Sequence, residues 1–136
     1  MTSVVLSNLI GTLAALSATG RPTVVGLDGR SGVGKSTLAA SIAAGTSAAV
    51  IGGDDFFAGG TTLIDGAPEH LADLCIDRLR LACVLRDLRA GRPIAYRAFD
   101  WEAFDGRLEA RATQVEPSGV ILVEGVYSCH PDLHGL

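Results

Sequence analysis

The residues best suited to chemistry lie in one glycine-rich segment, residues 29–36. Its sequence, Gly-Arg-Ser-Gly-Val-Gly-Lys-Ser, fits the pattern G-x-x-x-x-G-K-[ST], in which glycines let successive backbone N–H groups converge on phosphate. Lys35 is the only lysine among 11 basic residues and supplies a compact charge for β- and γ-phosphates. The hydroxyl of Ser36 suits Mg²⁺. We therefore predict that ATP and Mg²⁺ bind here, the nucleotide at Gly29, Gly32, Val33, Gly34, Lys35, Ser36 and Thr37.

Two neighbouring carboxylates, Asp54 and Asp55, follow an apolar run over residues 48–51. Ligands of open α/β sheets bind beyond the carboxyl ends of the strands. Either aspartate could therefore accept the proton of an attacking hydroxyl, and with Lys35 they form the predicted catalytic set. Aspartates at such a place equally suit a turn or a helix cap, and their spacing leaves both interpretations open.

A third carboxylate, Glu124, follows four apolar residues at 120–123. This pattern is typical of a strand whose terminal acid holds Mg²⁺ through a water molecule in phosphate-transferring enzymes. A carboxylate at a strand end is common, so the metal role depends on the complete glycine-rich motif upstream. On that basis the predicted metal site consists of Ser36 and, through water, Glu124.

An aromatic segment over residues 96–101 contains the only tryptophan of the chain. It is compatible with a hairpin edge held by aromatic packing. It is equally compatible with an acceptor pocket, in which a ring stacks on a planar group and a polar side chain binds a sugar or an acid. The predicted substrate-binding residues are Phe57, Tyr96, Arg97, Phe99, Asp100 and Trp101.

These residues need a scaffold, and the apolar patterns predict one. Strands are expected at residues 23–27, 48–53 and 120–125, and a helix at residues 36–44,. A further helix is expected between Pro68 and Gly91, because proline suits a first turn and glycine a helix end. An N-terminal helix is expected at about residues 3–18, where apolar side chains form one stripe: Leu6, Leu9, Ile10, Leu13 and Leu16. We therefore predict an α/β fold, with a parallel sheet between helical layers, in one domain over residues 1–136.

The composition excludes several classes of protein. The 15 acidic and 11 basic residues leave a net charge of −4, which argues against a nucleic-acid partner. The apolar N-terminal stretch has neither the basic start of a signal peptide nor the length of a membrane span. The three cysteines match no metal or redox spacing, so we expect reduced thiols in a cytoplasmic protein.

In their order along the chain, these motifs resemble the uridine kinase-like branch of P-loop kinases, akin to phosphoribulokinases and pantothenate kinases. The resemblance covers about residues 23–127. The two segments most specific to this branch are 54–57 and 99–101. It implies a three-layer P-loop NTPase fold with the ATP phosphates at residues 32–37 and Asp54 as the base. It further implies that residues 99–101 form the acceptor motif and that Glu124 is the strand-end acid. Glu102-Ala103-Phe104 stands where uridine kinases have a histidine.

The family continues beyond the strand of Glu124 with two further strands and an arginine-bearing lid. The resemblance therefore predicts an incomplete domain without these parts, whose P-loop strand has an unpaired edge open to self-association or to a partner chain. The predicted activity is transfer of the γ-phosphate of ATP to a hydroxyl of a nucleoside-like or other small metabolite. The alternatives are a nucleotide-binding module without phosphotransfer and a fragment that does not fold.

Overall fold

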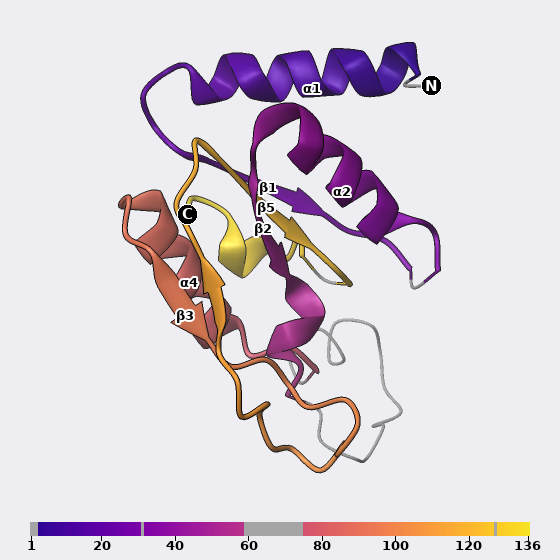
Figure 1. Cartoon of the computed structure of the whole chain (residues 1–136), viewed down its shortest axis with the longest axis vertical. Coiled ribbons are helices and arrows are strands. Elements are labelled where there is room, and N and C mark those ends of the chain that lie inside the picture. The colour runs from indigo at the N-terminus through magenta and orange to yellow at the C-terminus, as the bar shows by residue number, and fades with distance from the viewer. Residues whose placement is uncertain (1–2, 31, 59–74, 127) are drawn as a thin grey trace.

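The computed structural model describes residues 3–30, 32–58, 75–126 and 128–136. A parallel sheet lies between two helical layers (Figure 1). The helices α1 (Val4–Ser17) and α2 (Lys35–Thr46) cover one face, and α4 (Arg78–Arg89) covers the other. The strands of the sheet are β1 (Thr23–Leu27), β2 (Ala49–Gly52) and β5 (Val120–Glu124). The predicted α/β fold with a parallel sheet is confirmed.

The strand order β1-β5-β2 places the last strand in the middle of the sheet. Glu124 is in register with Leu27 on one side and with Gly52 on the other. The three strands therefore end at one level. The glycine-rich loop after β1 and the 3-10 turn after β2, η1 (Gly53–Phe56), consequently begin beside Glu124.

The apolar run of β5 is explained by burial on both faces. Val120 and Leu122 pack with Leu13 of α1 and with Ala39 and Ile42 of α2. Ile121 and Val123 point the opposite way, into a larger cluster that contains the buried α4 residues Leu81, Leu85 and Leu88. Because side chains alternate along a strand, a central parallel strand covered by helices must be apolar at every position.

Helix α1 lies within the range 3–18 expected for the N-terminal helix. Its first turn is capped by Ser3, whose hydroxyl accepts a hydrogen bond from the amide of Leu6 at 3.1 Å. The apolar stripe is narrower than the pattern indicated, because Leu9 and Leu16 are 37% and 44% exposed. The helix crosses α2 closely: a Cβ at Gly45 would lie 2.7 Å from the side chain of Ile10.

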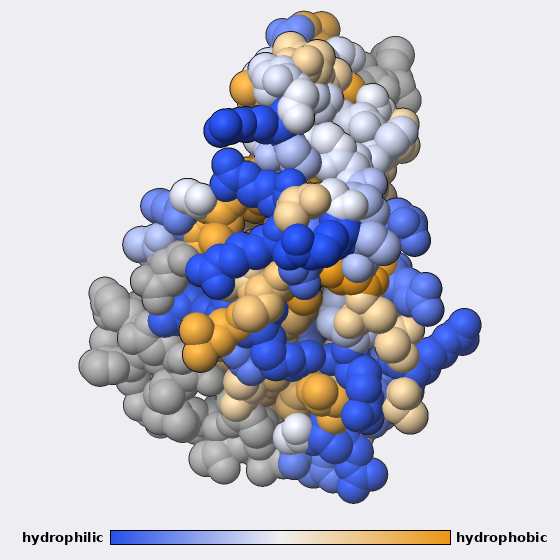
Figure 2. Space-filling model, turned by 90° about the vertical axis from the view of Figure 1, so that its left-hand side faces the viewer, coloured by the Kyte–Doolittle hydropathy of each residue, from blue (hydrophilic) through white to orange (hydrophobic). Residues whose placement is uncertain are grey.

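The helix expected between Pro68 and Gly91 is α4 within the described residues; Pro68 itself lies outside them. Asp77 caps its start by accepting from the amide of Arg80 at 3.1 Å. After the helix, β3 (Ile94–Tyr96) and β4 (Thr113–Val115) form an antiparallel pair. Figure 2 shows the side of the molecule on which α4 and β3 lie, where hydrophilic residues separate the apolar patches from one another.

Strand β1 is an edge strand: among the described residues it pairs with β5 alone. The self-association expected at this edge stays a prediction, which sedimentation velocity over a concentration series would test. In the described part of the chain, no helix has the length and apolarity needed to cross a membrane.

Candidate phosphate-binding site

The glycine-rich loop adopts a backbone that requires glycine at two positions. Gly32 and Gly34 have φ values of +80° and +96°, in the left-handed region,. Gly34 is the N-cap of α2, and because it has no side chain it does not cap the first-turn amides. Those N–H groups, at the positive end of the helix, are therefore available to an anion.

Lys35 lies at the first position of α2 and folds back along the loop. Its Nζ donates a hydrogen bond to the carbonyl of Arg30 at 2.7 Å. Its stem passes close to Gly29, where a Cβ would lie 3.6 Å from the lysine Cδ. The ammonium group is thus held over the loop by a single backbone contact that a phosphate oxygen could replace.

One cavity of about 340 Å³ collects most of the predicted phosphate and catalytic residues. It is lined by Gly32, Gly34, Lys35, Ser36, Thr37, Asp54 and Glu124. Two residues predicted to contact the nucleotide, Gly29 and Val33, do not line it, and Val33 is 64% exposed. The loop at the start of α2, the turn η1 and the end of β5, which are far apart in the sequence, therefore line the same cavity.

Ser36 and Glu124 contact each other across this cavity, since the hydroxyl of Ser36 donates a hydrogen bond to Oε1 of Glu124. A hydroxyl and a carboxylate are hard oxygen ligands of the kind that Mg²⁺ prefers. The two predicted metal residues therefore fit a magnesium ion in their chemistry and in their placement beside the loop.

Asp54 reaches the cavity from η1. Burial raises the pKa of its carboxyl group above the usual 3.8, and the charge of Glu124 raises it further, whereas Lys35 lowers it. The end of β5 comes very close: a Cβ at Gly125 would lie 3.3 Å from Oδ1 of Asp54. Asp54 is therefore a partly desolvated carboxylate with raised proton affinity.

Asp55 does not line the cavity. Its Oδ2 accepts a hydrogen bond of 2.6 Å from the hydroxyl of Tyr96 on β3. Burial and this bond to Asp55 raise the pKa of the Tyr96 phenol. The structure thus separates the two adjacent aspartates, one beside Lys35 and one beside Tyr96.

The aromatic segment packs against Phe57, the residue that follows η1. Phe57 and Trp101 have ring centroids 4.8 Å apart, and Phe99 meets both rings edge-on. Phe99 is 1% exposed, whereas Trp101 is 48% exposed. Aromatic packing of the hairpin therefore accounts for Phe99, while Trp101 retains surface that could meet an acceptor.

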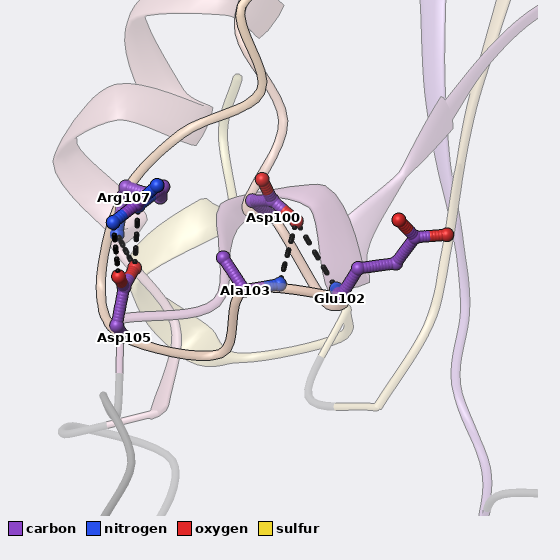
Figure 3. A network of polar contacts seen from close by, with 5 residues as sticks. All are labelled: Asp100, Glu102, Ala103, Asp105 and Arg107. Atoms are coloured by element: carbon purple, nitrogen blue, oxygen red, sulfur yellow. Dashed lines mark hydrogen bonds and ion pairs between the residues drawn. The ribbon is translucent and has the colours of Figure 1, made fainter.

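The polar residues of this segment are engaged by the chain itself. The guanidinium of Arg97 donates to the carbonyls of Glu109 and Leu108, at 2.6 and 3.3 Å. Asp100 accepts from the amides of Glu102 and Ala103, at 3.1 and 2.9 Å, and so shapes the loop (Figure 3). These contacts shape the loop, and the acceptor contacts expected for both residues stay a prediction.

Sequence reasoning missed two residues of this region. Asp28 directly follows β1 and joins two loops: its Oδ1 accepts from the amide of Gly29 at 2.7 Å and its Oδ2 from the amide of Cys129 at 3.1 Å. An aspartate directly before a glycine was the available signal. Phe104 completes the aromatic cluster, stacked on Phe57 and Trp101; no local pattern indicated its role.

A strand, a glycine-rich loop and a helix, beside acids at the ends of two neighbouring parallel strands, define the fold of P-loop kinases. No family model and no curated protein matches the chain. Among solved structures, a possible uridine kinase from Bacillus stearothermophilus matches 95% of this chain and 73% of its own, with 24% identity and a TM-score of 0.73.

A D-glycerate 3-kinase from Cryptococcus neoformans var. grubii also matches, with 15% identity and a TM-score of 0.55. The match covers 91% of this chain and 53% of that one, so the present chain spans about half the length of that kinase. The resemblance to uridine kinase-like P-loop kinases is thereby confirmed at the level of the fold.

Proposed function

We propose that the protein is an ATP- and Mg²⁺-dependent kinase that transfers the γ-phosphate to a hydroxyl of a small polar metabolite, a nucleoside-like one being the first candidate. The single observation that carries this proposal is the convergence of Lys35, Ser36, Glu124 and Asp54 on one cavity. A loop that binds phosphates needs the first two residues, and phosphate transfer to a hydroxyl adds an acid for the metal and a base.

The loop binds the triphosphate through its backbone. The amides that begin α2 and the ammonium group of Lys35 balance the negative charge of the β- and γ-phosphates. Ser36 and Glu124 would hold Mg²⁺, which when bound neutralises charge on the transferring phosphate. Thr37 follows on the same helical turn and lines the same cavity.

Asp54 acts as the base in this proposal. The acceptor oxygen forms a bond to the γ-phosphorus, the bond from that phosphorus to the oxygen of ADP breaks, and the hydroxyl proton passes to the Asp54 carboxylate. Its raised pKa supports this role, because proton affinity closer to neutral pH favours proton transfer,.

The acceptor side of the proposal rests on Trp101. Trp101 is 48% exposed, and its ring belongs to the cluster with Phe57, three residues after Asp54. A planar group stacked on Trp101 would therefore be tethered to the same turn as the base, as expected for a small molecule with an aromatic or conjugated ring.

The test combines nucleotide binding with phosphate transfer. Calorimetry should show binding of ATP that depends on Mg²⁺, and labelled γ-phosphate should reach at least one member of a panel of hydroxyl metabolites. Asp54→Asn should retain binding and lose transfer, and Asp87→Asn on α4 is the matched control. Equal transfer by the wild type and Asp54→Asn would refute the base. Binding without transfer to any acceptor would favour a nucleotide-binding module.

A further inference from the structure

Asp55 connects the turn that bears Asp54 to the β3 hairpin through two hydrogen bonds. Its side chain accepts from the Tyr96 hydroxyl at 2.6 Å. Its main-chain carbonyl accepts from the amide of Phe99 at 2.8 Å. Tyr96 is only 7% exposed, so its hydrogen bond to Asp55 is partly buried and is stronger than the same bond in open water.

The shape of the chain around Asp55 favours this one orientation. A Cβ at Gly52 would lie 3.2 Å from Oδ2 of Asp55, so the carboxylate rests against the end of β2 where glycine leaves room. The next residue, Phe56, is fully buried and its ring lies 4.8 Å from that of Tyr96. Tyr96 therefore contacts two consecutive residues of η1, one through its hydroxyl and one through its ring.

The other side of Asp54 is also closely packed. A Cβ at Gly125 would lie 3.2 Å from Cα of Gly53, so the end of β5 presses directly on the start of the turn. Gly53 and Asp55, the two neighbours of Asp54, are thus held by different strands. The turn between them has little freedom to rotate.

Consecutive side chains of a 3-10 turn project about 120° apart. An Asp55 carboxylate fixed on Tyr96 therefore leaves Asp54 directed elsewhere, and the structure places it in the cavity with Lys35. We propose that Tyr96, acting through Asp55, is a positioning residue that aims the Asp54 carboxylate at the reacting phosphate. This inference rests on the proposed kinase function, and it assigns to Asp55 and Tyr96 a role different from base and substrate contact.

The test removes one oxygen atom. Tyr96→Phe keeps the ring against Phe56 but deletes the hydroxyl that donates to Asp55. We expect kcat to fall roughly tenfold, as for the loss of a hydrogen bond to a charged group. The Kd and KM for ATP should stay at their wild-type values, because neither residue lines the phosphate cavity. Loss of structure alone would instead weaken nucleotide binding as well.

Two substitutions of Asp55 complete the design. Asp55→Asn keeps an oxygen that accepts from Tyr96 but loses the negative charge, so its kcat should fall less than that of a variant that deletes the acceptor. Asp55→Ala should match Tyr96→Phe, and the double variant should be no slower than either single variant, because both changes delete the same bond. If Asp55→Asn loses turnover as fully as Asp54→Asn, Asp55 is itself the base and the positioning role is refuted.

A measurement independent of activity separates this inference from the function beneath it. The ¹⁵N order parameter of the Asp54 amide should be lower in Tyr96→Phe than in the wild type. If the wild type transfers phosphate to no acceptor, the proposed function fails, and the order parameters then decide the positioning role. Equal order parameters in the wild type and Tyr96→Phe would overturn that role. If the wild type is active and Tyr96→Phe keeps its kcat, the positioning role fails and the function stands.

Discussion

The hydroxyl of Ser36 donates a hydrogen bond to the carboxylate of Glu124, although the two residues are 88 positions apart. The register of β5 against β1 brings them together, because Glu124 lies beside Leu27 just before the glycine-rich loop. The contact joins the start of α2 to the end of the central strand. A hydroxyl and a carboxylate oxygen meet there, and in the proposed function these two groups would hold Mg²⁺.

The first prediction concerns this pair. Glu124→Gln removes the negative charge but keeps the size of the side chain, and Ser36→Ala removes the other oxygen. Each change should weaken the effect of Mg²⁺ on nucleotide binding by about 10- to 100-fold. Titration of Mg²⁺ at fixed ATP in a calorimeter measures this. An unchanged magnesium dependence in both variants would contradict the metal site.

The second prediction concerns Lys35. Lys35→Ala deletes the only ammonium side chain that lines the cavity and should weaken ATP binding by about 10- to 100-fold, the value of a hydrogen bond to a charged group. Arg92→Ala is the control, since it removes an equal charge from the exposed end of the α4 region. Comparable losses in the two variants would show that general charge, and not the loop, governs binding.

The third prediction follows from the raised pKa of Asp54. Its carboxyl group binds a proton more tightly in the folded than in the unfolded chain, so its charge costs stability as the pH rises through its folded pKa,. Asp54→Asn should therefore raise the Tm at pH 7, and the gain should vanish below the ordinary value of 3.8. Thermal unfolding over a pH series measures the difference between the two proteins.

Asp105→Asn is a control that should change stability at pH 7 in the opposite direction. Hydrogen bonds from the backbone and side chain of Arg107 lower the pKa of Asp105, so this variant should lose stability at pH 7. The loss should vanish as the pH falls through the pKa of the carboxyl group. A Tm that falls in Asp54→Asn at pH 7 would contradict the desolvation of that residue.

The fourth prediction concerns the core beneath the sheet. Leu85 on α4 is fully buried, so Leu85→Ala leaves a cavity and should lower the free energy of unfolding by about 2–5 kcal/mol. Leu79→Ala on the same helix is the matched control, because Leu79 is 82% exposed and should change stability by no more than about 0.5 kcal/mol. Urea unfolding of both variants provides the comparison. Equal losses of unfolding free energy in the two variants would contradict the placement of Leu85 in the core.

The sequence was sufficient for those parts of the site that depend on local pattern. The glycine-rich loop is contiguous, and its geometry follows from residues that adopt positive φ. The acids at 54 and 124 were predicted because strands of a parallel sheet end at one edge, and the register of β5 confirms that both stand at that edge. The phosphate-binding half of the site could therefore be predicted from local sequence patterns.

The remaining parts depend on contacts between distant segments. The spacing of Asp54 and Asp55 could not separate their roles, because the separation depends on Tyr96, 41 residues further along. Arg97 and Asp100 have the chemistry of ligand-binding residues, but the loop between β3 and β4 turns them toward its own backbone. No local pattern encodes how such a loop folds.

The position of β5 at the centre of the sheet also has a consequence for the folding of the chain. β1 and β2 do not pair with each other; each pairs with β5, which is the last of the three to leave the ribosome. The loop of Lys35 and the turn of Asp54 are both synthesised early, but neither has its neighbour until residues 120–124 emerge. We therefore expect the site to assemble late and in one step, through contacts of high sequence separation that make folding slow.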